Sequence, residues 1–229
     1  MIGIICALDK EAEKLRENMT SPSTEHVGQL EFTSGELKGQ SVVIGMAGVG
    51  KVNAAMCAQA MILRYAPTLI VNSGVAGSLS AKLDIGDIAV GTGVVEHDFD
   101  TTAMGDPPAF FNELNGDTFP CDPDAVQAIL RAAEAEGVRA VPAKIASGDR
   151  FISEAMEKER LVSMFGAEAC EMESGAIAHV CFKNDVKCAI IRAISDSTDG
   201  EHHVEFYKFL PVAADNSARV LMRFLQNLQ

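Results

Sequence analysis

The chain has 229 residues, 48% hydrophobic and 22% charged, which is ample for a folded core and excludes a largely disordered protein. Acidic residues outnumber Lys and Arg by 32 to 19, and the formal net charge is −13. Since that charge repels phosphate groups, nucleic acid and membrane are poor partners, and a small neutral or cationic ligand is expected. With no bilayer-spanning apolar run, no leader pattern after Met1 and six scattered cysteines, a cytoplasmic location is expected.

The first third of the chain alternates apolar runs with helical patterns and glycine-rich turns. In chain order the expected elements are strand 2–8, helix 10–18 with Asp9 as its N-cap, strands 26–33 and 40–46, helix 52–65 and strand 68–73. The turn at residues 47–50 (AGVG) precedes the second helix. These buried strands, each followed by a helix or a hairpin, favour an α/β fold.

The same alternation continues to the end of the chain. The expected elements are strand 85–95, loop 96–120, helix 124–136, strand 138–146, a helix from about Glu154, strand 170–172, a helix from Glu173, strand 187–194 and helix 204–227. A loop as long as 96–120 is usually functional or meets a partner. With neither repeat nor linker, residues 1–229 are expected to form one domain, a three-layer αβα sandwich with a mixed, mostly parallel central sheet.

Three carboxylates stand out because each follows an expected strand. Glu11 begins a helix after the first strand, Glu173 lies where a short strand breaks into a helix, and Asp196 follows the strand that ends at Ile194. Ligands of such sheets bind at the carboxyl ends of the strands. A single carboxylate there is more often a cap or a solvated group, but the three together fit glycosidic cleavage, which needs carboxylates in different environments.

Other motifs carry less weight. Residues 45–51 match the phosphate-loop pattern G-x-x-x-x-G-K, but Val52 lacks the hydroxyl that would bind Mg²⁺, so a glycine-rich turn near a ligand is preferred to an NTPase. His97-Asp98 with Asp100, and the segment 199–203, have no familiar metal-ligand spacing. Solvated polar loops explain them better, and no metal is expected.

Several strings together resemble a known family. They are IGIICALDKE (2–11), AGVGKVNAA (47–55), NSGVAGSL (72–79), IGD (85–87), SGDRFI (147–152), EMESGAIAHVC (171–181) and RAISDSTD (192–199). In this order they are similar to 5′-methylthioadenosine/S-adenosylhomocysteine nucleosidases of the nucleoside phosphorylase superfamily. The resemblance covers essentially the whole chain and implies a nucleoside phosphorylase-like fold, with EMES and AISD as its most specific parts.

The resemblance implies a role for each carboxylate. Asp196, oriented by Ser195, would donate a proton or hydrogen bond to N7 of adenine and so make the base a neutral leaving group. Glu173 would accept hydrogen bonds from the ribose hydroxyls and stabilise a cationic sugar. Glu11 would activate the attacking water, with Arg192 holding Glu11 in place.

The resemblance also implies binding contacts around these carboxylates. Phe151 would stack on adenine, the Ile152 backbone would recognise the edge of the base, and Met172 would pack under the ribose. The apolar slot for the 5′-alkylthio group would be lined by Leu8, Val49 and Phe206. Val75 stands where many members carry Ser, so only its backbone would serve the water or the ribose.

Function and assembly follow from the resemblance as expectations. The chain would hydrolyse 5′-methylthioadenosine and S-adenosylhomocysteine in methionine salvage, without metal or cofactor, as a homodimer whose loop near residues 104–111 reaches the neighbouring site. The apolar run 107–111 is expected to be exposed, which fits a contact with a partner; the alternative is a loop that folds down as a lid. Aminodeoxyfutalosine and 5′-deoxyadenosine are alternative substrates. A purine nucleoside phosphorylase is disfavoured because Asp9 and Glu11 would repel phosphate. A non-catalytic adenosine-binding module would be favoured only if a carboxylate were missing.

Overall fold

Buried apolar runs form the strands that organise this protein. The computed structural model describes residues 1–196 and 202–228, with side chains for 1–196 and 206–228, so the segment 199–203 lies outside the described side chains. The strands are β1 (Ile2–Cys6), β2 (Thr20–Val27), β3 (Leu30–Leu37), β4 (Gln40–Met46), β5 (Leu69–Ser78), β6 (Ile88–Glu96), β7 (Thr118–Pro120), β8 (Ala140–Ser147), β9 (Ala169–Glu171) and β10 (Lys187–Asp196). The helices are α1 (Asp9–Glu17), α2 (Lys51–Tyr65), α3 (Pro123–Ala135), α4 (Ala155–Phe165), α5 (Ser174–Lys183) and α6 (His202–Gln226), with a short 3₁₀ helix η1 (Thr102–Met104).

The described strands join into one mixed sheet. Their order is β10-β6-β8-β9-β5-β1-β4-β3-β2, with β7 added on β6 and a further pairing of β10 with β5 that closes β10, β6, β8, β9 and β5 into a ring. The parallel pairs are β1–β4, β1–β5, β5–β10, β6–β8 and β8–β9, and the other pairings are antiparallel. The predicted mixed sheet is confirmed. Antiparallel pairs are as frequent as parallel ones among the described strands, whereas the sequence suggested a mostly parallel sheet.

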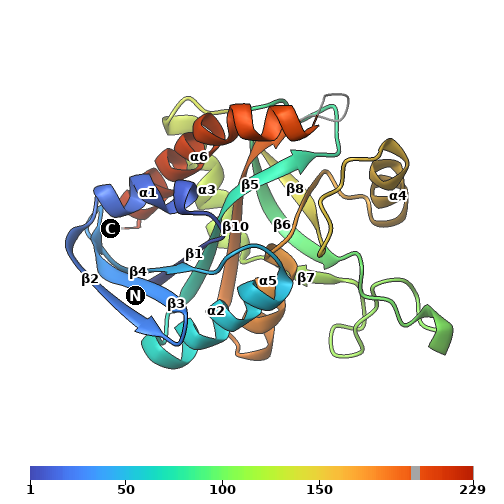
Figure 1. Cartoon of the computed structure of the whole chain (residues 1–229), viewed down its shortest axis with the longest axis horizontal. Coiled ribbons are helices and arrows are strands. Elements are labelled where there is room, and N and C mark those ends of the chain that lie inside the picture. Colours follow the sequence, from blue (N-terminus) through green and yellow to red (C-terminus); the bar gives the residue numbers. More distant parts are fainter. Residues whose placement is uncertain (197–201, 229) are drawn as a thin grey trace.

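Helices cover both faces of this sheet (Figure 1). Helices α1, α3 and α6 lie together on one face, and α2 and α5 pack against each other on the opposite face. All five residues of β1 are buried, as expected for a strand in the middle layer, and apolar residues of β5 and β10 extend the same core. The predicted three-layer αβα arrangement is confirmed.

Three local predictions are wrong. The single strand expected over residues 26–33 is a β2–β3 hairpin that turns at Gly28, where φ is +62°. The N-cap of α1 is Leu8 instead of Asp9. The apolar run 107–111, expected to be exposed, turns partly inward: Ala109 and Phe111 are buried, and Phe111 stacks on Phe99 with ring centroids 4.3 Å apart.

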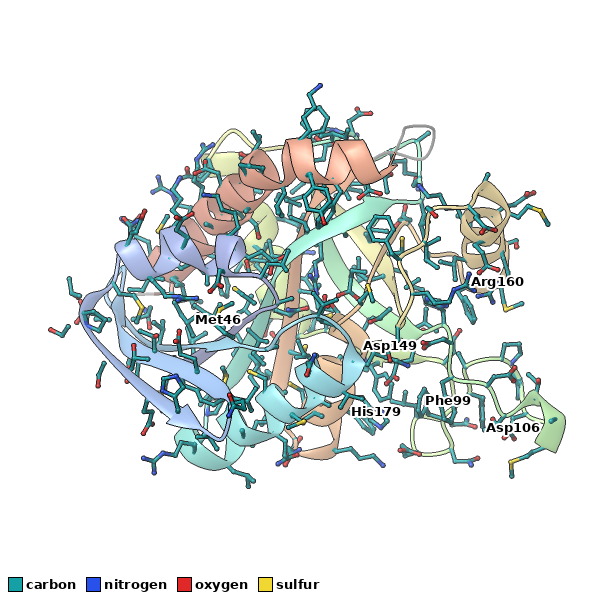
Figure 2. The ribbon with its side chains drawn as sticks, in the orientation of Figure 1. Met46, Phe99, Asp106, Asp149, Arg160 and His179 are labelled. Atoms are coloured by element: carbon teal, nitrogen blue, oxygen red, sulfur yellow. The ribbon has the colours of Figure 1, made fainter. Side chains whose placement is uncertain are left out.

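The segment between β6 and β7 still projects from the body, at the lower right of Figure 1. Its base is fixed by aromatic contacts, since Phe111 also meets Phe119 and the ring of His179, whereas Asp106 lies near the far end of the segment (Figure 2). Its tip carries Met104, which is 82% exposed. Among the described helices, none is both long and apolar enough to cross a membrane.

Candidate active site

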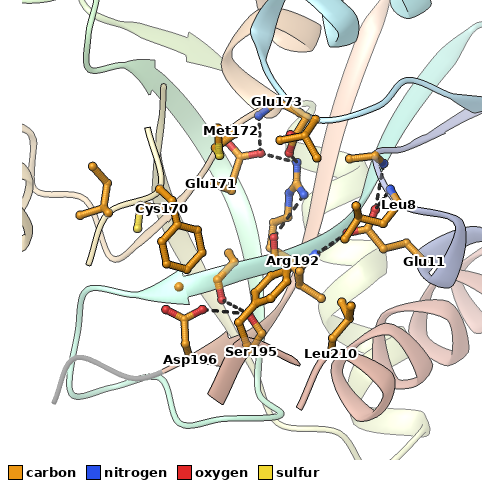
Figure 3. Close-up of a pocket in the computed structure, with 18 of the residues that line it drawn as sticks. Leu8, Glu11, Cys170, Glu171, Met172, Glu173, Arg192, Ser195, Asp196 and Leu210 are labelled. Atoms are coloured by element: carbon orange, nitrogen blue, oxygen red, sulfur yellow. Dashed lines mark hydrogen bonds and ion pairs between the residues drawn. The ribbon is translucent and has the colours of Figure 1, made fainter. Parts of the chain in front are cut away.

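One cavity gathers the side chains that the sequence singled out. It has a volume of about 440 Å³ and lies where β1, β5, β9 and β10 end, with the start of α6 along one side (Figure 3). The following residues of the sequence analysis all line it: Leu8, Glu11, Val49, Val75, Phe151, Ile152, Met172, Glu173, Arg192, Ser195, Asp196 and Phe206. Residues from one end of the chain to the other therefore share one site. The parallel strands β1, β5 and β10 end at the same edge, and β9 runs antiparallel to β5 and pairs with it at Gly77 and Ser78.

Glu11 is held in the site by the turn that starts α1. Its Oε2 accepts hydrogen bonds from the backbone N–H groups of Ala7 at 2.8 Å and Leu8 at 2.9 Å, and its Oε1 accepts from Val75 N at 3.2 Å. The Glu11 side chain accepts from the backbone N–H of Leu8, the N-cap residue of α1. This bond explains why α1 can begin at a residue whose own side chain cannot cap the helix. Burial raises the pKa of Glu11, while the Arg192 charge and the backbone donors oppose that rise. A buried carboxylate with a raised pKa is a suitable base near neutral pH.

Glu173 lies at the break between β9 and α5. Its Oε1 accepts a hydrogen bond from Gly50 N at 2.9 Å, and its Oε2 lies 3.3 Å from Nη2 of Arg192. Gly50 has φ +99°, a conformation that glycine adopts without strain, and it aims this N–H at the carboxylate. Burial, with Glu171 adding to it and Arg192 opposing it, raises the pKa of Glu173 to about 7.

Arg192 is the central cation of the site, and it is only 1% exposed. The resemblance implied that Arg192 holds Glu11 in place, but none of its described hydrogen bonds goes to Glu11. It donates to Glu171, Glu173, Asn72 Oδ1, Ser174 Oγ and the Val75 carbonyl. The hydrogen-bonded link from Arg192 to Glu11 is indirect: the Val75 carbonyl accepts from the guanidinium, and the Val75 N–H donates to the Glu11 carboxylate. The charge of Arg192 also acts on Glu11 through space.

Sequence reasoning missed three of these partners, namely Asn72, Glu171 and Ser174. All three fall inside the strings NSGVAGSL and EMESGAIAHVC, but no pattern along the chain indicates that they meet. The available signal was Arg192 itself, since an arginine inside an apolar strand needs buried acceptors around it.

Gly74 shows how closely the Glu11 carboxylate and the Arg192 guanidinium approach the backbone of β5. A Cβ at position 74 would lie 2.5 Å from Nη1 of Arg192 and 2.6 Å from Oε1 of Glu11. Side-chain atoms cannot come that close, so the space between these two groups exists only because residue 74 is glycine.

Asp196 occupies the other end of the cavity, beside the aromatic wall (Figure 3). It ends β10, is 2% exposed, and accepts a hydrogen bond from Ser195 Oγ at 2.9 Å. Ser195 Oγ also lies 3.4 Å from the Ala76 carbonyl, so the serine is fixed to the neighbouring strand.

The remaining walls are mostly apolar. The rings of Phe151 and Phe206 meet edge to face with centroids 5.9 Å apart, and Phe151 is 49% exposed. Leu8 lies beside Glu11 (Figure 3), and Val49 also lines the cavity. The sequence did not identify the further lining residues Arg150, Cys170, Tyr207 and Leu210. A flat, apolar molecule with a few polar groups would fit between these walls.

The glycine-rich turn before α2 is occupied by the protein's own carboxylates. Gly50 N donates to Glu173, and Lys51 N donates to Asp149 Oδ1 at 2.7 Å. The Lys51 ammonium pairs with Asp98 and, at 3.3 Å, with Glu96. A phosphate loop would need these groups free. Among the described residues no cluster of three or more His, Cys, Asp or Glu could hold a metal ion.

Comparison with known proteins gives a consistent result. A sequence model of the phosphorylase superfamily matches residues 1–226. The chain is 36% identical over 229 residues to the 5′-methylthioadenosine/S-adenosylhomocysteine nucleosidase of Shewanella sediminis, covering 99% of both chains. It matches the nucleosidase structure from Neisseria meningitidis, in complex with methylthio-immucillin-A, with a TM-score of 0.94 and 35% identity over 99% of this chain and 98% of that one. The native futalosine hydrolase of Helicobacter pylori strain 26695 matches with a TM-score of 0.94 and 31% identity, over 99% and 97% of the two chains. The chain therefore belongs to the phosphorylase superfamily and, within it, to the 5′-methylthioadenosine/S-adenosylhomocysteine nucleosidases.

Proposed function

We propose that this protein hydrolyses the N-glycosidic bond of 5′-methylthioadenosine and S-adenosylhomocysteine, releasing adenine and the 5′-thioribose. The observation that carries the proposal is the convergence of Glu11, Glu173 and Asp196 on one largely apolar cavity. The names of its relatives support the substrate class. We further propose that residues 1–229 act as one nucleosidase domain in methionine salvage.

Departure of the base is assigned to the Asp196 end of the cavity. Asp196, oriented by Ser195, donates a proton toward N7 of adenine, so that the base leaves as a neutral molecule. Phe151 would stack on the purine ring, and the backbone of Ile152, which follows it in the same loop, would recognise the edge of the base. Both residues line the cavity, which supports these roles. The place of Asp196 in the cavity wall, only 2% exposed and bonded to Ser195 Oγ at 2.9 Å, supports this role.

Attack on the sugar is assigned to the opposite end. As the glycosidic bond lengthens, the ribose gains positive charge, which the carboxylate of Glu173 stabilises while accepting hydrogen bonds from the hydroxyls. Met172 packs under the ring. Glu11 removes a proton from the attacking water, whose oxygen joins C1′. Val75 contributes its backbone N–H to Glu11 at 3.2 Å, so this arrangement needs no side-chain hydroxyl at position 75.

The 5′ substituent is assigned to the apolar side formed by Leu8, Val49 and Phe206. Leu210 adds to the same surface, since it also lines the cavity. A thioether is apolar and polarizable, so such a slot favours it over a 5′-hydroxyl.

Water is preferred to phosphate as the nucleophile because two of the positive charges near the site are already paired, and Arg150, which also lines the cavity, has a side chain that is 62% exposed and lies 4.0 Å from Glu157. Arg192 is bonded to Glu171 and Glu173, and Lys51 to Glu96 and Asp98. The test is adenine release from 5′-methylthioadenosine in phosphate-free buffer and again with phosphate. Release without phosphate supports hydrolysis. Release only with phosphate would make this a phosphorylase, and binding without release would favour the adenosine-binding module.

A futalosine-type nucleoside is the second candidate substrate, because the futalosine hydrolase of Helicobacter pylori matches the whole fold. Aminodeoxyfutalosine shares the adenine and ribose and differs in its 5′ group, as does 5′-deoxyadenosine. Comparing kcat/KM for these nucleosides with that for 5′-methylthioadenosine decides the preference. A ratio above one for aminodeoxyfutalosine would reassign the main substrate.

We also propose a homodimer located in the cytoplasm. The projecting segment ends in the exposed Met104, and α2 presents Val52, Met56 and Leu63, which are 70%, 57% and 78% exposed. Exposed apolar groups of this kind usually meet a partner. Light scattering should give a mass near twice 24.4 kDa, and Met56→Glu should lower it. A monomeric mass for the unmodified chain would refute the dimer. The six cysteines are free and buried, which supports a reducing compartment.

A further inference from the structure

Glu171 is a buried carboxylate in the site to which the proposed mechanism gives no role. It ends β9, and its side chain is 2% exposed. Its Oε2 accepts hydrogen bonds from Glu173 N at 3.0 Å, Ser174 N at 2.8 Å and Ser174 Oγ at 2.9 Å, and it pairs with the Arg192 guanidinium (Figure 3). Its Oε1 is buried without a hydrogen-bond partner among the described atoms. One oxygen of Glu171 therefore carries all its described bonds.

These bonds fix the position of Glu173 from two directions. The two backbone donors are the N-cap residue of α5, Glu173, and its first residue, Ser174, so Glu171 caps that helix and sets the direction in which the Glu173 side chain leaves the backbone. The guanidinium that Glu171 holds is the same one that lies 3.3 Å from the Glu173 carboxylate. Moving Glu171 would therefore displace both the backbone and the counter-ion of Glu173.

Glu171 also affects the charge of Glu173. The groups that face Glu173 are Arg192 from β10, Glu171 from β9, Glu11 from α1 and the Gly50 N–H that precedes α2. Arg192 favours the ionised form of Glu173, whereas the two glutamates disfavour it. Because Glu171 shares Arg192 with Glu173, it also takes part of the attraction that would otherwise act on Glu173 alone.

We propose that Glu171 is a positioning residue for Glu173: it fixes the start of α5, and it fixes the guanidinium of Arg192, which it shares with Glu173. The catalytic consequence rests on the proposed function, because it requires Glu173 to hold the ribose. The structural and electrostatic part stands without any substrate.

The test is Glu171→Gln, which keeps the shape of the side chain and removes its charge. The amide oxygen can replace Oε2 as acceptor, and the amide nitrogen can take the place of Oε1. The pKa of Glu173 is measured by ¹³C NMR of Cδ-labelled glutamate, with the signal assigned by its absence in Glu173→Gln. Glu168→Gln is the matched control, because Glu168 precedes the same strand but pairs with Lys82 at the surface, 3.0 Å away.

The proposal requires the pKa of Glu173 to fall in Glu171→Gln, since a like charge is removed and Arg192 becomes more available, and to stay unchanged in Glu168→Gln. A substitution that only loosened the site would separate Glu173 from Arg192 and raise this pKa instead. An unchanged or raised pKa therefore overturns the proposal. A lowered pKa in a protein that cleaves no nucleoside would refute the proposed function and leave this inference standing.

Kinetics provide a second test, which also serves if the Gln variant does not fold. Glu171→Asp is one methylene shorter and cannot reach the backbone of α5 and Arg192 together. We expect kcat to fall about 10²-fold, as is typical when a catalytic group is displaced by about 1 Å. Inhibition by free adenine should stay unchanged, because the adenine end of the site lies beside Asp196. Wild-type kcat in the Asp variant would contradict the positioning role.

Discussion

Glu173 should make the stability of this fold depend on pH, and Glu173→Gln should remove that dependence. Its pKa is raised from 4.5 to about 7, chiefly because the side chain is only 5% exposed. A carboxyl group whose pKa is higher in the folded state contributes stability below its unfolded pKa, and that contribution is lost as the pH rises through the folded pKa. At roughly 1.4 kcal/mol per pKa unit, the wild-type protein should lose about 2–3 kcal/mol relative to the variant between about pH 5 and pH 8.

The measurement is urea unfolding of both proteins at several pH values in that range. The difference between their free energies of unfolding is compared across pH, so the constant cost of losing a hydrogen bond in the variant cancels. Glu154→Gln, which changes an exposed carboxylate at the start of α4, should follow the wild type. If the wild-type protein and Glu173→Gln instead change in parallel, Glu173 ionises normally in the fold and the reasoning about its burial fails.

Four further substitutions test the rest of the site. Asp196→Asn should abolish adenine release while thermal unfolding stays near that of the wild type; surviving activity would exclude Asp196 as the proton donor. Glu11→Gln should still bind 5′-methylthioadenosine in calorimetry but not cleave it, and loss of binding would mean that its role is misassigned. Arg192→Met should cost about 3–5 kcal/mol of unfolding free energy at neutral pH, because it leaves buried carboxylates unpaired, and a loss below about 1 kcal/mol would contradict that pairing. Gly74→Ala should reduce kcat/KM sharply through the clash described above, whereas Gly116→Ala, whose Cβ meets no heavy atom closer than 3.9 Å, should not; equal effects would refute the steric argument.

The strands that could be predicted are those whose burial shows in the sequence as an apolar run. Strand β1 is buried along its whole length, so its apolar run is unmistakable. Strand β2, with the sequence TSPSTEHV, is exposed throughout or nearly so. It therefore has no hydrophobic periodicity, and Pro22 argues against a strand except at an edge. Strand β2 forms because the hairpin pairs it with β3, and its own residues give no signal for a strand. For this reason the sequence suggested one strand where there are two.

Part of the candidate site could be predicted from the sequence and part could not. Glu11, Glu173 and Asp196 could be found because each follows a recognisable strand, and strand ends converge in this topology. The partners of Arg192 could not, because Asn72, Glu171 and Ser174 become neighbours only when β5, β9 and β10 are placed side by side. An arginine inside an apolar strand is expected to need buried acceptors, but the sequence does not show which residues supply them.

The start of α2 shows why the same loop motif can suggest phosphate and yet serve a different chemistry. A helix N-terminus preceded by a glycine turn attracts anions, since its N–H groups are free and its dipole is positive there. In this chain those N–H groups bind the carboxylates of Glu173 and Asp149, at 2.9 and 2.7 Å. An anionic nucleophile would have to displace one of them and would then face Glu11 as well. A neutral water molecule meets neither obstacle, so the arrangement that disqualifies the motif as a phosphate loop also favours hydrolysis over phosphorolysis.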